Sequence, residues 1–220
     1  MMKKTLLSIA MTSVLATTAF ISTSASAVEG LSANAAATSN YLWRGVEQSG
    51  GDAAVSGGID YADDSGFYVG TWASSLGGES YELVDDELVG GHSYELDLYA
   101  GFGGDISDSI SYDVGFIYYA YPDADDSDFS EVYCSVSFDA LTVGVAVLTS
   151  SDAKNSDGSD IDAGDSIYAN ADYAFDLGNE LELALHLGSY SGDVLGEDEY
   201  IDYGVSLSKS GFTFGASATD

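Results

Sequence analysis

Segments of about ten residues with alternating apolar and polar side chains recur along the chain from residue 31 onward. In residues 180–190, leucine occupies four successive odd positions from Leu181 to Leu187, whereas the even positions include Glu182 and His186. A helix, with its period of about 3.6 residues, would mix these two sets, but a β-strand places them on opposite faces. The alternation therefore predicts an all-β chain.

Eleven such segments can be counted, and most are close to the roughly 9–11 residues that a tilted strand needs to cross a bilayer. They cover residues 31–46, 53–62, 67–75, 94–103, 110–120, 129–138, 141–149, 166–176, 180–190, 199–208 and 211–218. After the first one, the connections alternate between short turns and longer loops. Outer-membrane barrels have short periplasmic turns and long outer loops, so the N-terminus is predicted to be periplasmic.

The first 27 residues have the three zones of a secretory signal peptide. Lys3 and Lys4 precede an apolar stretch, and Ala25-Ser26-Ala27 forms a cleavage site of small residues. We therefore expect residues 1–27 to be removed and residues 28–220 to form one domain. An anchor helix is the alternative, but Thr and Ser interrupt the apolar stretch. Later segments are too short for a transmembrane helix, so any crossing of a membrane is predicted to be by strands.

These features predict an antiparallel up-and-down transmembrane β-barrel of about 12 strands, of the type found in Gram-negative outer membranes. Since bacterial single-chain barrels have even strand numbers, a closing strand is expected beyond Asp220. A soluble β-sandwich or jelly roll is the alternative. Aromatic residues near the predicted strand ends favour the membrane barrel, where they would form interfacial girdles. They are Tyr41, Trp43, Tyr61, Phe67, Tyr94, Phe102, Tyr112, Phe138, Phe175 and Tyr200.

The chain is strongly acidic, with 37 Asp and Glu residues and a formal charge of −32. Loss of the two signal-peptide lysines would leave three cationic residues and a charge of −34. Such a surface repels phosphates, so nucleic-acid binding is excluded. A hydrophobic content of 45% predicts a folded protein rather than a disordered acidic one. Cys134 is the only cysteine, so no intrachain disulfide is expected, and it is interpreted as a small apolar strand residue.

If the apolar faces contact lipid, the opposite faces line the lumen, because a carboxylate on the lipid face would be costly. This parity predicts ten pore-lining residues: Arg44, Asp60, Glu95, Asp97, Asp113, Glu131, Asp172, Glu182, His186 and Asp202. Carboxylates in a channel wall concentrate cations and exclude anions. For each residue separately, hydration of a polar interior or adaptation to a saline habitat is an equal alternative.

Arg44 is expected to face inward near the outer end of the first strand, where it either forms a structural ion pair or marks a solute site. The Asp-rich segments 123–128 and 157–162 could bind divalent cations weakly, but they lack the EF-hand pattern and are interpreted as solvated outer loops. Neither a cofactor nor a dedicated metal site is expected. An enzyme is disfavoured because His92 and His186 are the only histidines and no nucleophile elbow is present.

Several motifs carry a family resemblance. The sequence SNYLWRGVEQS at residues 39–49, GGIDY at 57–61, SGFYVGTWAS at 65–74 and ELDLYAG at 95–101 resemble the TorF family of outer-membrane β-barrels, and YDVG at 112–115 and IYY at 117–119 continue the pattern. The resemblance is close over residues 39–122. Over the rest of the chain it is looser and consists of the regular spacing of the predicted strands. It implies a porin in the outer membrane. Members commonly end in a strand with a terminal aromatic residue, which this sequence lacks.

The sequence therefore leads to two functional hypotheses. The first is a porin that allows passive, cation-preferring diffusion of small hydrophilic or cationic solutes through an acidic lumen. The second is a closed structural or adhesive barrel that uses its acidic surface loops. Outer-membrane lipid is an expected partner in both cases.

Overall fold

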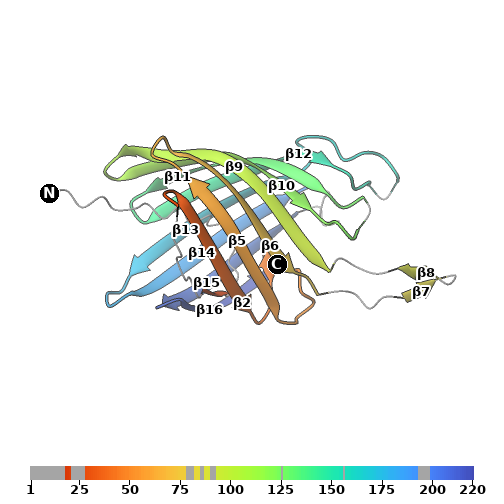
Figure 1. Cartoon of the computed structure of the whole chain (residues 1–220), viewed down its shortest axis with the longest axis horizontal. Helices are drawn as coiled ribbons and strands as arrows, with labels where there is room; N and C mark the ends of the chain where they lie inside the picture. The colour runs from red at the N-terminus through yellow and green to blue at the C-terminus, as the bar shows by residue number, and fades with distance from the viewer. Residues whose placement is uncertain are drawn as a thin grey trace.

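The computed structural model describes residues 18–20, 28–77, 82–84, 87–89, 93–124, 126–155, 157–192 and 199–220. Its main feature is a twelve-stranded antiparallel sheet in which each strand pairs with the next along the chain (Figure 1). The strands are β1 (Thr18–Phe20), β2 (Leu31–Thr38), β5 (Ala54–Ala62), β6 (Phe67–Ser75), β9 (Tyr94–Ser107), β10 (Ile110–Ala120), β11 (Phe129–Phe138), β12 (Leu141–Ser151), β13 (Ile167–Asp176), β14 (Leu181–Ser191), β15 (Glu199–Lys209) and β16 (Phe212–Thr219). The all-β, up-and-down architecture is as predicted.

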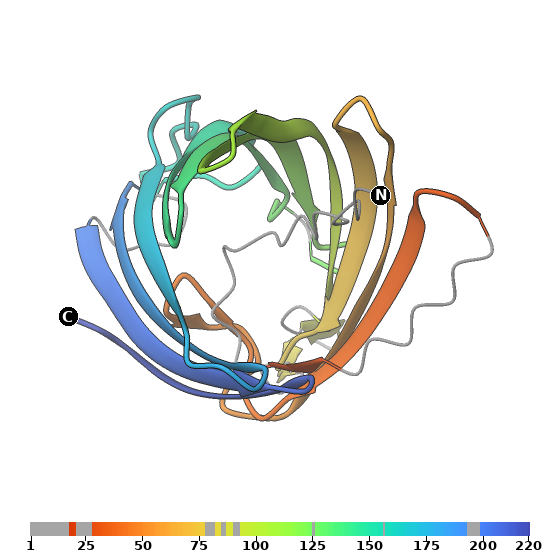
Figure 2. The same cartoon turned by 90° about the vertical axis from the view of Figure 1, so that its left-hand side faces the viewer.

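The sheet curls around an interior, as Figure 2 shows in a view along the barrel. Its first strand, β1, pairs with β2 and also lies next to β16, so the two ends of the sheet approach each other. β1 belongs to the segment that we expect to be removed as a signal peptide, which stays a prediction. The other eleven strands correspond to the eleven predicted segments.

The first predicted strand, residues 31–46, is wrong in its second half. β2 ends at Thr38, and the chain then forms a separate small hairpin from β3 (Leu42–Trp43) and β4 (Val46–Glu47). The turn between them consists of Arg44 and Gly45, which have φ angles of 50° and 80°. Positive φ at two successive residues is the signature of a type I′ turn, for which glycine is favoured. A second small hairpin, β7 (Glu82–Val84) with β8 (Glu87–Val89), lies within the connection between β6 and β9.

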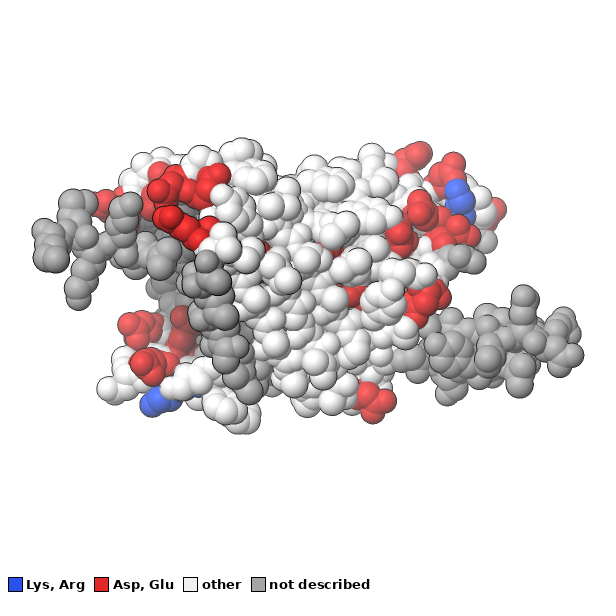
Figure 3. Space-filling model, in the orientation of Figure 1, with Lys and Arg blue, Asp and Glu red and all other residues white. Residues whose placement is uncertain are grey.

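The outer surface of the barrel carries its apolar side chains. Exposed large hydrophobic residues alternate along the strands, for example Val132 and Val136 on β11, and Cys134 between them is also exposed. On the face seen in Figure 3, acidic side chains gather at the two ends of the barrel and leave an uncharged band between them. The outward direction of the apolar faces agrees with the parity prediction. Within the described residues, no helix has the length and hydropathy needed to cross a membrane.

Three of the aromatic residues expected in the interfacial girdles lie elsewhere. Tyr41, Trp43 and Tyr200 are buried in the interior, with exposed fractions of 2%, 7% and 7%. The first two enter with the hairpin, and Tyr200 has the same inward parity on β15 as Asp202. The other seven residues of that set are partly or largely exposed.

Tyrosines and glycines on neighbouring strands fit together inside the barrel. Tyr68 on β6 lies opposite Gly101 on β9, and Tyr133 on β11 lies opposite Gly115 on β10. In both pairs the ring occupies the space in which a Cβ atom of the glycine would lie. The interior is therefore filled in part by aromatic rings that cover bare backbone on the next strand.

Candidate functional site in the barrel interior

The β3–β4 hairpin folds into the barrel. It enters from the end where β2 finishes and β9 and β11 begin, and it lies inside the ring of strands in Figure 2. Its base is closed by Gln48, whose N–H donates to the Tyr41 carbonyl at 2.8 Å, and by Ser49, whose hydroxyl accepts from the Tyr41 N–H at 2.8 Å. Gly77 N–H donates to the Gln48 carbonyl at 3.0 Å, which ties the hairpin to the end of the β6 strand.

Arg44, at the tip of the hairpin, forms a buried ion pair with Glu131 on β11. Its two terminal nitrogens donate to the two carboxylate oxygens at 2.7 and 2.6 Å, and both side chains are 3% exposed. Burial alone would lower the pKa of the guanidinium, but the charge and hydrogen bonds of Glu131 outweigh burial and raise that pKa above its usual value. Arg44 therefore stays charged. The ion pair fixes the hairpin tip to the opposite wall of the barrel.

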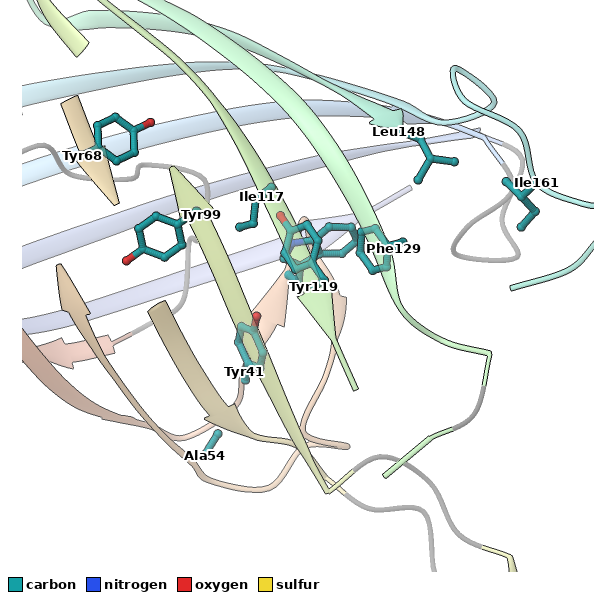
Figure 4. Close-up of a cluster of buried hydrophobic side chains, with 10 residues drawn as sticks. Tyr41, Ala54, Tyr68, Tyr99, Ile117, Tyr119, Phe129, Leu148 and Ile161 are labelled. Atoms are coloured by element: carbon teal, nitrogen blue, oxygen red, sulfur yellow. The ribbon is translucent and has the colours of Figure 1, made fainter. Parts of the chain in front are cut away.

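Aromatic side chains enclose the tip. The Arg44 guanidinium lies 4.2 Å from the ring centroid of Trp43 and 4.4 Å from that of Tyr168 on β13. Trp43 makes edge contacts with Tyr119 and Phe129. The rings of Tyr119 and Phe129, which lie side by side in Figure 4, stack on each other. Their centroids are 4.4 Å apart. Such cation–π and aromatic contacts stabilise the position of the hairpin tip in addition to the ion pair.

A second group of polar residues lies at the base of the hairpin. Glu95 on β9 is 1% exposed and accepts hydrogen bonds from the hydroxyls of Tyr41 and Tyr121, both at 2.7 Å. Burial, followed by the charges of Glu95 and Asp97, raises the pKa of the Tyr41 hydroxyl, and the same influences raise that of Tyr121. Both hydroxyls therefore keep their protons and act as donors to Glu95. Asp97, two residues along the same face, is 7% exposed, and its Oδ1 atom has no hydrogen-bond partner in the described part of the chain.

A third group surrounds His186 on β14. Its Nδ1 atom lies 2.6 Å from Asp172 and its Nε2 atom 2.7 Å from Asp202, while the Tyr168 hydroxyl lies 2.9 Å from Nε2. Asp202 is 1% exposed. Asp202 lies so near Gly45, in the turn of the hairpin, that a Cβ atom at Gly45 would collide with it. The group around His186 is therefore next to the hairpin.

The remaining predicted interior residues are less buried. Asp113 accepts from the Tyr68 hydroxyl at 2.8 Å, and that hydroxyl also contacts the Tyr133 hydroxyl at 2.5 Å. Asp60 accepts a short hydrogen bond from the hydroxyl of Tyr99. Glu182 lies at the start of β14 and is exposed.

Nine of the ten predicted residues therefore lie in or against the interior, and they separate into distinct groups around the hairpin. The position of Arg44 is a correction: it lies in the turn of a hairpin, not on the first strand. Tyr41, Trp43 and Tyr168 were not predicted as interior partners. The dipeptide Arg44-Gly45 is the signal that could have located the turn, since glycine favours the positive φ found there.

In the acidic loops, several of the carboxylates that the structure describes form local contacts. Asp123 accepts from the Ser93 N–H at 2.8 Å, Asp128 accepts from the Tyr121 N–H at 2.7 Å, and Asp160 pairs with Lys154. Asp125, in the first of these loops, and His92 lie outside the described residues. Among the residues described, no group of three or more His, Cys, Asp or Glu side chains is arranged to hold a metal ion.

Comparison with known proteins identifies a family. The model of a family described as "Bacterial protein of unknown function (Gcw_chp)" matches residues 22–220. This name differs from that of the TorF family, so the resemblance to TorF stays a prediction. Comparison with curated proteins gives no match.

Solved structures show a distant likeness. Pseudomonas aeruginosa OccD3 (OpdP) is 12% identical with a TM-score of 0.40, and the match covers 88% of this chain and 61% of that one. A variant of OccD1 (OprD) is 14% identical with a TM-score of 0.36 and the same coverage. Pseudomonas aeruginosa OpdQ is 12% identical with a TM-score of 0.37, and 64% of its chain is covered. The chain thus spans less than two thirds of the length of these structures.

Proposed function

Because the chain belongs to the bacterial Gcw_chp family, whose description gives no function, its role has to be inferred from its own geometry, and we propose that it is an outer-membrane porin. In this proposal, small hydrophilic or cationic solutes diffuse passively past the β3–β4 hairpin. The signal peptide would direct export, and the barrel would be embedded in the outer membrane with its long loops outside.

The observation that carries the proposal is the contrast between the two faces of the sheet. Apolar side chains are exposed on the outside, whereas ionisable side chains such as Asp60, Asp113 and Asp172 are on the inside. A soluble barrel would place these faces the other way round, because water would then contact the outer surface. An apolar outer band around a polar interior is the arrangement of a membrane channel.

The hairpin would set the width and the selectivity of the path. It places Arg44 inside the barrel, where Glu131 neutralises the charge of Arg44. In this proposal the interior as a whole is acidic. Carboxylates in a low-dielectric wall favour cations over anions. We therefore expect a small conductance with a preference for cations.

A closed structural barrel is the second candidate. It is favoured by the extent to which the hairpin and its aromatic neighbours fill the interior: Tyr41, Trp43 and Phe129 are all less than 10% exposed. In this case the acidic loops would be the functional surface and no solute would pass.

Recording of ion currents in planar lipid bilayers separates the two candidates. The folded protein would be compared with a variant in which residues 41–49 are replaced by a short Gly-Ser linker. A porin gives discrete current steps that become larger in the linker variant, with reversal potentials that indicate cation preference. If neither protein passes current although both have the far-UV circular dichroism of a β-barrel, the porin proposal is wrong and the structural barrel stands.

A further inference from the structure

Glu95 and Asp97 differ from the other buried carboxylates of the barrel because they lack a cationic partner. Glu131 is paired with Arg44, and Asp172 and Asp202 flank His186. No ion pair to Glu95 or Asp97 is present among the described residues. Two carboxylates are thus buried together without a countercharge that the described part of the chain supplies.

The two side chains share one face of β9. They are two residues apart, which separates their Cα atoms by about 7 Å and directs both side chains into the interior. Asp97 lies between Trp72 and Tyr119 on the neighbouring strands, and both of these also belong to the interior face. Glu95 and Asp97 are 1% and 7% exposed. Two carboxylates on adjacent inward positions of one strand can both reach an ion that lies between them with its water ligands.

The hydrogen bonds in this region leave one oxygen unused. Both oxygens of Glu95 accept from tyrosine hydroxyls, which hold the carboxylate in a fixed orientation. Among the residues that the structure describes, none donates a hydrogen bond to the buried Oδ1 atom of Asp97. A buried carboxylate oxygen without a donor is costly, so a ligand that satisfies it would stabilise the fold.

We propose that Asp97 and Glu95 hold one partly hydrated divalent cation of the hard, oxygen-ligated class, Mg²⁺ or Ca²⁺. Its two positive charges balance the two carboxylates, and water completes the coordination, as is usual where only one or two carboxylates bind such an ion. Tyr41, which orients Glu95, comes from the hairpin, so the ion also stiffens the attachment of the hairpin to β9. The site does not depend on ion flux, and it stands even if the protein conducts nothing.

Thermal unfolding of the folded protein in detergent micelles tests the proposal, with EDTA, MgCl2 or CaCl2 added in separate samples. A ligand that binds only the folded state stabilises it by RT ln(1 + c/Kd), where c is the free ligand concentration, so Tm rises further as c is increased above Kd. We expect at least one of the two cations to raise Tm of the wild type. Asp97→Asn should abolish this rise and, in EDTA, should melt at or above the wild-type temperature, because it removes an uncompensated charge. Isothermal titration should give one tight site per chain in the wild type.

Asp160→Asn is the matched control, since Asp160 is an exposed loop carboxylate and the acidic loops could bind divalent cations weakly. This variant should keep the full cation-dependent rise in Tm. Glu95→Gln is the second test variant if Asp97→Asn does not fold, and it too should lose the rise. Equal rises in the wild type and in the folded test variants would assign the cation to the loops and overturn the proposal. Absence of any rise and of any tight site in the wild type would overturn it as well, because the carboxyl groups would then be neutralised by protons.

Discussion

At the scale of single residues, the Arg44–Glu131 pair is the contact on which the position of the hairpin depends. Removal of one partner of a buried ion pair leaves the other charge uncompensated and costs about 3–5 kcal/mol. We expect Arg44→Met to lower the free energy of unfolding by this amount, as measured by urea titration in lipid vesicles. Arg44→Met combined with Glu131→Leu should recover most of the loss, because neither charge then remains buried.

Lys154→Met is the control for this pair. Lys154 and Asp160 also form an ion pair, but their side chains are 52% and 73% exposed. Exposed pairs contribute about 0–1 kcal/mol. If Arg44→Met costs no more than Lys154→Met, then the hairpin is not fixed by its ion pair.

The tyrosine–glycine contacts allow a second prediction for single residues. A Cβ atom at Gly115 would collide with the Tyr133 ring and with the Ala100 carbonyl, whereas one at Gly104 would be 3.5 Å from the nearest atom of Tyr112. Overpacking of this kind costs about 1–3 kcal/mol. Gly115→Ala should therefore lower the urea midpoint, and Gly104→Ala, at an ordinary contact distance, should leave it nearly unchanged. Equal effects of the two substitutions would contradict the tight fit of Tyr133.

Sequence parity assigns each side chain to one face of a strand but does not predict which residues meet. A period of two tells which face a side chain occupies, so Glu95, Glu131 and Asp202 were all expected inside. It carries no information about contacts between strands that are distant in sequence. The pairing of Arg44 with Glu131 across 87 positions depends on the curvature of the sheet and on the entry of the hairpin, which alternation does not encode.

At the scale of elements, the strands were predicted closely because each one buries one face and exposes the other. Eight of the eleven predicted segments agree with the structure to within one residue at both ends. The large exception, residues 31–46, followed from continuing the alternation through Asn40 to Val46. There, the Thr38 hydroxyl donates to the Asn40 carbonyl at 2.9 Å and the chain leaves the sheet. Such local side-chain bonds compete with strand pairing and are weak signals in a sequence.

The exposed apolar face makes a prediction that depends on depth in the membrane. Val114, near the middle of β10, and Ile106, near the end of β9, are 47% and 65% exposed on the outside. An arginine on the lipid face costs about 2–4 kcal/mol at the midplane and about 0–1 kcal/mol near the interface. Val114→Arg should therefore reduce the free energy of unfolding in vesicles far more than Ile106→Arg.

The unfolding of the two arginine variants would also be measured in detergent-free buffer for comparison. If the barrel were a soluble protein, both positions would face water, and the two arginine substitutions would be almost neutral and equal in their effect on unfolding. That result would contradict the membrane location of the barrel. A large cost at Val114 alone would support it.

At the scale of the whole molecule, the distribution of charge would govern ion selectivity if the barrel conducts. The chain carries 37 acidic residues and five cationic ones. Among the residues that the structure describes, carboxylates lie in the interior and at the two ends of the barrel. Loop carboxylates act on a passing ion through salt solution, in which the Debye length falls from about 10 Å at 0.1 M to about 3 Å at 1 M. Interior carboxylates, surrounded by protein, are screened much less.

Two double variants separate these contributions if the barrel conducts. Asp157→Asn with Asp160→Asn removes two exposed carboxylates from the loop after β12, and Asp60→Asn with Asp113→Asn removes two partly exposed carboxylates from the interior. Reversal potentials across a KCl gradient should show that the interior variant loses cation preference at both 0.1 M and 1 M salt. The loop variant should lose part of it at 0.1 M only. If instead the loop variant alone alters selectivity, ions are selected at the outer surface. The interior carboxylates would then hydrate the interior and form the internal ion pairs, and they would not select the ions that pass.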